Sequence, residues 1–105
     1  MNPRRVHELM RELFPKRPES ASEWVVVVDE QGLRVSVVED LVRSYIAAEL
    51  VLVEANRKVG GMLTVPAAID FIAAHANKGR ILIADREFSG FVVVESNGVA
   101  SGWSK

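Results

Sequence analysis

The hydrophobic positions at the start of the chain recur with the period of a helix. They follow i, i+3, i+4, i+7 and i+8 spacing and so share one face: Val6, Leu9, Met10, Leu13 and Phe14. Asn2 suits the N-cap position and Pro3 the first helical turn. Pro15 ends the helix, because the residue before a proline avoids helical geometry. The pattern predicts an amphipathic helix followed by a polar linker that runs to residue 23.

The next segment has the pattern of strands. Four consecutive valines, residues 25–28, predict a strand that is buried on both faces. After a turn over residues 29–32, apolar and polar residues alternate as in a half-buried strand. Its apolar positions are Leu33, Val35 and Val37. The two segments together predict a β-hairpin.

The middle of the chain allows two interpretations. The pattern Ser-Val-Val-Glu at residues 36–39 has the form of a capping box and predicts the start of a helix. We favour a helix that continues to Lys58, because the glutamate, alanine, arginine and lysine near its end are good helix formers. In the alternative, the helix ends near Glu49, and residues 50–54 pair with residues 59–65 as a hairpin.

The long helix would carry more apolar surface than a domain of this size can cover. Its apolar arc contains Tyr45 and Leu52, and also two polar residues, Glu49 and Asn56, seven positions apart. A second copy of the chain or another protein would cover this arc, and the two polar residues would then fix its register. Trp103, near the carboxyl terminus, is a further candidate contact. The predicted interaction residues are therefore Tyr45, Glu49, Leu52, Asn56 and Trp103.

The last third of the chain predicts one helix and three strands. Thr64 and Pro66 mark the start of the helix. Asn97-Gly98 is a strong hairpin signal between the last two strands. The strands cover residues 80–84, 90–95 and 99–103.

The order of these elements, α-ββ-α-α-βββ, indicates one small α+β domain over residues 1–105. We expect an antiparallel sheet of about five strands, with two or three helices packed on one face. Residues 1–23 form the N-terminal helix and linker, and residues 24–105 form the body. The first helix docks at an edge of the sheet or on a partner copy. The predicted core consists of Val26, Val28, Val35, Leu41, Tyr45, Ile69, Ile72, Ile81, Ile83, Phe91 and Val93.

The amino-acid composition excludes several kinds of functional site. The 105 residues are 49% hydrophobic and 26% charged, and they include no cysteine. The lack of thiols excludes disulfide frameworks, thiol nucleophiles and thiolate metal sites, and it fits a reducing compartment. No segment has the apolar run of a signal peptide or a membrane span. We therefore expect a cytoplasmic protein that does not bind a membrane.

Charge is unevenly distributed along the chain. The formal net charge of −1 gives no general attraction to nucleic acid. Residues 1–17 hold five basic and two acidic residues, a net charge of +3, whereas the remaining residues carry −4. Arg4, Arg5 and Arg11 are candidate anion contacts, but glutamates lie among them at helical pairing distances. We rank nucleic-acid binding last for this reason.

No pattern indicates catalysis, a cofactor or a metal. His7 and His75 have no second ligand three or four residues away. Adjacent carboxylates such as Asp29-Glu30 occur in turns, which do not provide the distinct environments that acid–base catalysis needs. Nucleophile-elbow, phosphate-loop and dinucleotide-binding motifs are absent from the sequence. We predict no catalytic, cofactor-binding or metal-binding residues, and we lean towards a protein that is not an enzyme.

The remaining features indicate an interaction protein. We predict a non-catalytic protein-interaction module, such as an adaptor, an immunity-type inhibitor or a regulator. It forms a homodimer or binds a larger protein. One alternative is a small-molecule-binding protein or minor enzyme with a pocket between sheet and helices. The other is a nucleic-acid binder that uses the basic first helix.

Overall fold

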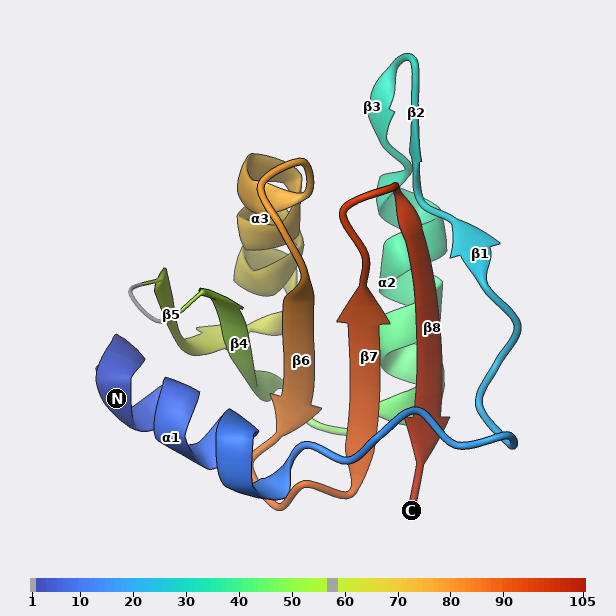
Figure 1. The fold of residues 1–105 in the computed structure, drawn as a ribbon. Helices are drawn as coiled ribbons and strands as arrows, with labels where there is room; N and C mark the ends of the chain where they lie inside the picture. Colours follow the sequence, from blue (N-terminus) through green and yellow to red (C-terminus); the bar gives the residue numbers. More distant parts are fainter. Residues whose placement is uncertain (1, 57–58) are drawn as a thin grey trace.

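The computed structural model describes residues 2–56 and 59–105 and contains a six-stranded antiparallel sheet with helices on both faces (Figure 1). The helices are α1 (Pro3–Leu13), α2 (Val35–Tyr45) and α3 (Val65–His75). The sheet has the order β1-β8-β7-β6-β4-β5, and β2 and β3 form a separate two-stranded ribbon. The strands are β1 (Val25–Val26), β2 (Val28–Asp29), β3 (Gly32–Leu33), β4 (Leu50–Asn56), β5 (Val59–Thr64), β6 (Ile81–Asp85), β7 (Gly90–Val94) and β8 (Val99–Ser104).

This arrangement confirms the predicted α+β class and the antiparallel sheet, with six strands in place of about five. The third helix and the three closing strands lie where the sequence places them, and Gly98 adopts the positive φ that the turn between β7 and β8 requires. No helix among the described residues is long and apolar enough to cross a membrane.

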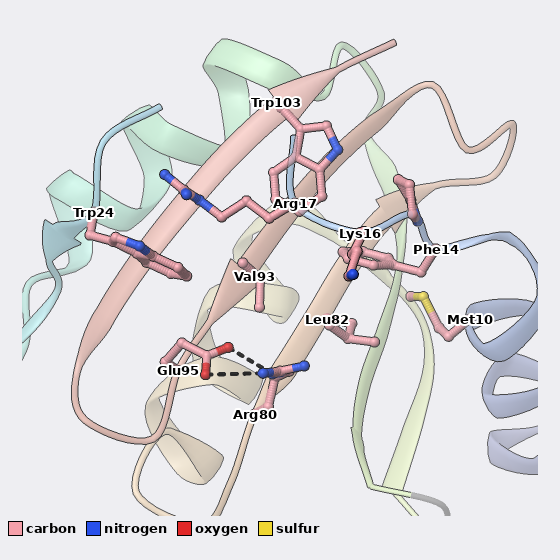
Figure 2. A pocket seen from close by; sticks show the side chains of 11 residues that line it. Met10, Phe14, Lys16, Arg17, Trp24, Arg80, Leu82, Val93, Glu95 and Trp103 are labelled. Atoms are coloured by element: carbon pink, nitrogen blue, oxygen red, sulfur yellow. Dashed lines mark hydrogen bonds and ion pairs between the residues drawn. The ribbon is translucent and has the colours of Figure 1, made fainter. Parts of the chain in front are cut away.

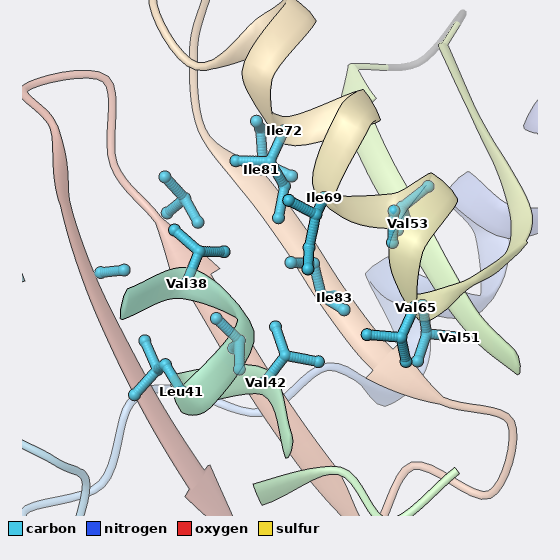
Figure 3. Close-up of a cluster of buried hydrophobic side chains, with 14 of the residues drawn as sticks. Val38, Leu41, Val42, Val51, Val53, Val65, Ile69, Ile72, Ile81 and Ile83 are labelled. Atoms are coloured by element: carbon cyan, nitrogen blue, oxygen red, sulfur yellow. The ribbon is translucent and has the colours of Figure 1, made fainter. Parts of the chain in front are cut away.

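The face of the sheet towards α2 and α3, here called the closed face, holds the larger core. Residues at every second position of the central strands point to this face, because strand side chains alternate. Ile81 and Ile83 of β6 meet α2 and α3 there, as Figure 3 shows. The buried members are Val27, Val38, Leu41, Val42, Ile46, Val51, Val53, Val65, Ala68, Ile69, Ile72, Ile81, Ile83, Val92, Val94 and Ala100.

The opposite face, here called the open face, has a smaller core. Helix α1 lies across β4 and β5 on this side and buries Val6 and Met10 against the sheet. The first helix therefore packs on its own sheet, at the β5 edge. Residues 14–24 then cross the ends of β7 and β8 on the way to β1 (Figure 1). The buried members are Val6, Met10, Leu52, Ala84, Phe88, Phe91, Val93 and Trp103.

The favoured long helix over the middle of the chain is wrong. Helix α2 ends at Tyr45, and β4 and β5 form the alternative hairpin, with Val51 opposite Leu63 and Leu52 opposite Met62. The aliphatic run from residue 51 to 53 buries one face against the α2 and α3 side of the sheet and the other against α1. This burial outweighs helix propensities of a few tenths of a kcal/mol per residue. Arg57 and Lys58, which the long helix includes, lie outside the described residues.

The hairpin predicted from the valine run is present only as the short ribbon of β2 and β3, and the rest of the prediction is corrected. Only two valines pair in β1, and the chain then turns so that Val27 is buried while Val26 is 50% exposed. Val35 begins α2 instead of continuing a strand, and it is 52% exposed. Both residues were predicted in the core. Val28 and Tyr45 pack at its margin, and the other predicted core residues are buried.

Candidate functional site

The open face contains a hollow of about 790 Å³ that α1 and residues 14–24 leave uncovered. Figure 2 shows Val93 and Leu82 between Trp103 at one end and Arg80 with Glu95 at the other. The lining residues are Met10, Phe14, Pro15, Lys16, Arg17, Trp24, Arg80, Leu82, Val93, Glu95 and Trp103.

The strand register places the floor of this hollow. Leu82 and Val93 are cross-strand partners in β6 and β7, and Phe91 and Trp103 are partners in β7 and β8. Side chains that are directly opposite in paired strands project from the same face. The floor is therefore a continuous apolar surface built from three neighbouring strands.

Trp103 anchors one end of the floor. Its side chain is 4% exposed, and its ring centroid lies 5.7 Å from those of both Phe14 and Phe91. The indole Nε1 is buried without a hydrogen-bond partner among the described residues. Packing therefore positions this ring, and no polar contact of the indole contributes.

The Arg17 side chain forms one wall of the hollow. Its Nε donates a hydrogen bond to Ser101 Oγ (3.0 Å) and its Nη2 donates to the Ser22 carbonyl oxygen (2.7 Å). The guanidinium carbon lies 4.6 Å from the centroid of the Trp24 ring, which is a cation–π distance. These contacts hold Arg17 in place and leave Nη1 without a partner among the described residues.

Two further cations lie at the rim. Arg80 and Glu95 form an ion pair with 2.7 Å between Nε and Oε1, so much of the Arg80 charge is neutralised. Lys16 makes no hydrogen bond or ion pair with any residue that the structure describes. The lining thus holds three basic residues and one acidic residue on a chain whose net charge is −1.

The predicted interaction residues do not gather at one place. Trp103 lines the hollow, whereas Leu52 is buried beneath α1. The Tyr45 ring packs on Gly102, where an added Cβ would lie 2.4 Å from the ring. Glu49 is exposed and lies 3.6 Å from Arg43. The backbone of Asn56 belongs to β4, and its side chain is outside the described part of the structure.

The candidate anion contacts on α1 do not line the hollow either. Arg4 and Arg5 both lie near the Glu8 carboxylate, at 3.7 Å and 3.4 Å, and Arg11 is exposed. Sequence reasoning missed Lys16 and Arg17 as site residues. The excess of basic residues over positions 1–17 was the available signal, but only the path of the linker shows which of these cations meet the sheet.

His7 is not a solvent-facing residue of α1. Its Nδ1 lies 2.8 Å from Glu54 Oε1 of β4, and both side chains are largely buried. The pair joins two elements that are 47 positions apart in the sequence. It fixes α1 across the sheet and lies away from the lining of the hollow.

A second hollow, of about 490 Å³, lies beside the turn between β6 and β7. Asp85 lines it and accepts a hydrogen bond from the Ser89 backbone N–H (2.7 Å), and its carboxylate also contacts Ser89 Oγ. These bonds close the turn, so the carboxylate has a structural role. No group of three His, Asp or Glu side chains among the described residues is arranged to hold a metal ion.

A comparison of the chain with protein-family models, curated protein sequences and solved structures finds no match. The function must therefore be argued from the geometry of the hollow.

Proposed function

We propose that the protein is a non-catalytic interaction module, and that the hollow binds an acidic segment of a partner protein through an apolar side chain flanked by carboxylates. The observation that carries the proposal is the combination of an apolar floor, formed by Leu82, Val93 and Trp103, with a cationic rim. Because a chain without cysteine fits a reducing compartment, we also propose that the protein acts in the cytoplasm.

The floor and its Trp24–Arg17 wall supply the binding free energy. Tryptophan and arginine are the residue types that most often dominate protein interfaces, because they bury large areas and still make directional contacts. Trp24 is 44% exposed beside a guanidinium that is already fixed by two hydrogen bonds. An apolar side chain that enters the hollow covers Trp24 without ordering a mobile arginine, so little conformational entropy is lost.

The rim selects the charge of the partner. The Lys16 ammonium and the Nη1 group of Arg17 have N–H donors that are not used within the described part of the chain, while Arg80 is paired with Glu95. Carboxylates beside the apolar side chain therefore meet two available cations. Complementary charge of this kind increases the association rate and suppresses partners of the wrong sign.

The shape favours a peptide segment. Lys16, Arg17, Trp24 and Arg80 are all exposed, so the hollow is open along its rim. Val26 also belongs to this face, since its neighbour Val25 pairs with Ala100 on the closed face. The exposed Val26 extends the apolar surface beyond the hollow along β1, as an extended segment requires.

Single-stranded nucleic acid fits less well. It needs a cationic track with successive aromatic platforms. The hollow provides one exposed aromatic ring, Trp24, and Glu95 adds a negative charge at the rim. The basic residues Arg4 and Arg5 of α1 already pair with Glu8.

The test is calorimetric titration with a panel of five-residue peptides. Each has one central residue (Phe, Trp, Leu or Val) flanked by two glutamates on each side, and a matched panel carries lysines instead. At least one acidic peptide should bind and none of the basic peptides should. Lys16→Glu should weaken acidic-peptide binding about fivefold, the equivalent of about 1 kcal/mol. Lys78→Glu, on the loop after α3, is the matched control and should leave the affinity unchanged.

Two results would overturn the proposal. One is no binding of any acidic peptide at millimolar concentration. The other is tighter binding of a deoxythymidine oligonucleotide than of any peptide, with the same sensitivity to Lys16→Glu, which would transfer the site to a nucleic-acid ligand.

A further inference from the structure

Strand β5 is a free edge of the sheet over residues 60–64, where its register with β4 is regular; the ladder shifts only at its other end, between Glu54 and Asn56 of β4. It pairs with β4 on one side, and no described strand pairs with it on the other. Its six residues, Val-Gly-Gly-Met-Leu-Thr, include no charge and no proline. Proteins that do not use an edge for association usually block it with a charge, a proline, a bulge or a very short strand. The other edge, β1, follows this rule because it has only two residues.

The register shows which backbone groups of β5 face outward. The Val65 N–H donates to the Glu49 carbonyl oxygen at 3.0 Å, which makes residues 49 and 65 a hydrogen-bonded pair. Hydrogen-bonded and non-hydrogen-bonded pairs alternate in an antiparallel ladder. Leu63 and Gly61 therefore bond to β4, through their partners Val51 and Val53.

Within the regular part of the ladder, residues 60–64, the alternate residues Gly60, Met62 and Thr64 direct their N–H and C=O groups away from β4. Thr64 is the N-cap of α3, so its carbonyl accepts the first bond of that helix. The outward donors are thus the N–H groups of all three residues. The outward acceptors are the carbonyls of Gly60 and Met62.

These positions are symmetric about Met62. We infer that the protein forms a homodimer in which two β5 strands pair antiparallel across a two-fold axis at Met62, joining two sheets into one. Met62 of each copy exchanges both backbone hydrogen bonds with Met62 of the other. The Thr64 N–H of each copy donates to the Gly60 carbonyl of the other. The inference is independent of the hollow on the open face.

The outward hydrogen-bonding groups of β5 complement themselves about Met62, and the composition of the strand also suits pairing with a second copy. In the pairing about Met62, Gly60 faces Thr64 and Gly61 faces Leu63, so no like charges are brought together, which would be destabilising in facing strands. The Met62 side chain is only partly buried against the open-face core, so two Met62 side chains also contact each other at the axis.

The test is molar mass by light scattering over a wide concentration range. The wild-type chain should reach twice its 11.6 kDa mass. Met62→Pro removes an outward N–H and leaves the bonds to β4 intact, which edge strands tolerate. It should give a monomer at every concentration. Met62→Ala loses the same side chain but keeps the N–H, and should remain a dimer at the higher concentrations.

Amide hydrogen exchange of the wild type gives a second readout that does not depend on the folding of a variant. The N–H groups of Met62 and Thr64 should be protected at high concentration and should exchange rapidly on dilution. Those of Gly61 and Leu63, bonded within the chain, should stay protected throughout. A wild-type monomer at millimolar concentration, a dimeric Met62→Pro variant, or unprotected Met62 and Thr64 amides in the dimer would each overturn the inference.

Discussion

The two faces of the sheet are built from the same strands and differ in how they are covered. On the closed face, α2 and α3 bury Ile81, Ile83 and Val92 completely. On the open face, α1 lies mainly on β4 and β5, and the neighbours Leu82 and Val93 form the floor of a hollow. Adjacent residues of one strand therefore serve different purposes. The closed face is covered by two helices, whereas the open face keeps a hollow in which we propose that a partner binds.

The largest expected effect comes from truncating neighbours on opposite faces of β6. Ile83→Ala should lower the free energy of unfolding by about 4 kcal/mol, because Ile83 is fully buried and leaves a cavity. Leu82→Ala should cost about 1 kcal/mol, because Leu82 is only partly buried at the hollow. Urea denaturation of the two variants measures the difference. Equal losses would show that the open face is packed as tightly as the closed one.

A second pair of variants tests how tightly α2 ends against the sheet. A Cβ at Gly90 would lie 1.9 Å from the Tyr45 carbonyl oxygen, so Gly90→Ala should cost about 3 kcal/mol. Gly61, on the edge strand, has no atom within 4 Å of the same position. Gly61→Ala should change the melting temperature little, and a similar loss in both variants would contradict the close approach of α2 to β7.

On the open face, the His7–Glu54 contact should stabilise the docking of α1. His7→Ala leaves a largely buried carboxylate without its partner and should cost about 2 kcal/mol. His75→Ala, at the end of α3, is the control and should have a smaller effect. Hydrogen exchange of the α1 amides reports the result: exchange should quicken in the His7 variant, and unchanged rates would show that apolar packing alone holds the helix.

Replacement of Trp24 should have the smallest effect on stability and a large effect on peptide binding. Trp24→Ala should change the free energy of unfolding by less than about 0.5 kcal/mol, because the ring is exposed. It should weaken binding of the acidic peptides at least about tenfold, as the loss of an interface anchor does. Parallel denaturation and titration curves test this, and a stable variant with wild-type affinity would remove Trp24 from the site.

The periodicity of apolar residues was enough to predict several helices and strands. The first helix, the third helix and the closing strands follow from local patterns because each is bounded by a clear cap or turn, such as Asn2, Thr64 and Gly98. The hairpin of β4 and β5 was harder. Leu50 to Val53 fit a helix and a strand equally until both faces of the strand are given partners, α1 on one side and α3 on the other.

The hollow could not be predicted from local sequence patterns, because its lining residues are far apart along the chain. Arg17 meets Ser101, 84 positions later, because the linker crosses the sheet. Arg80 and Glu95 meet because β6 and β7 are neighbours. Trp103 alone was predicted as a contact residue and lies in the hollow. The other lining residues come together through the topology of the sheet and linker, which no spacing along the chain encodes.

The most direct test of the proposed division between the faces is a nuclear magnetic resonance titration of the labelled protein with the tightest-binding acidic peptide. The amides of Lys16, Arg17 and Trp24 and the indole N–H of Trp103 should shift. The amides of α2 and α3 should stay in place. Shifts concentrated on α2 and α3, with the residues of the hollow unmoved, would contradict the proposed division.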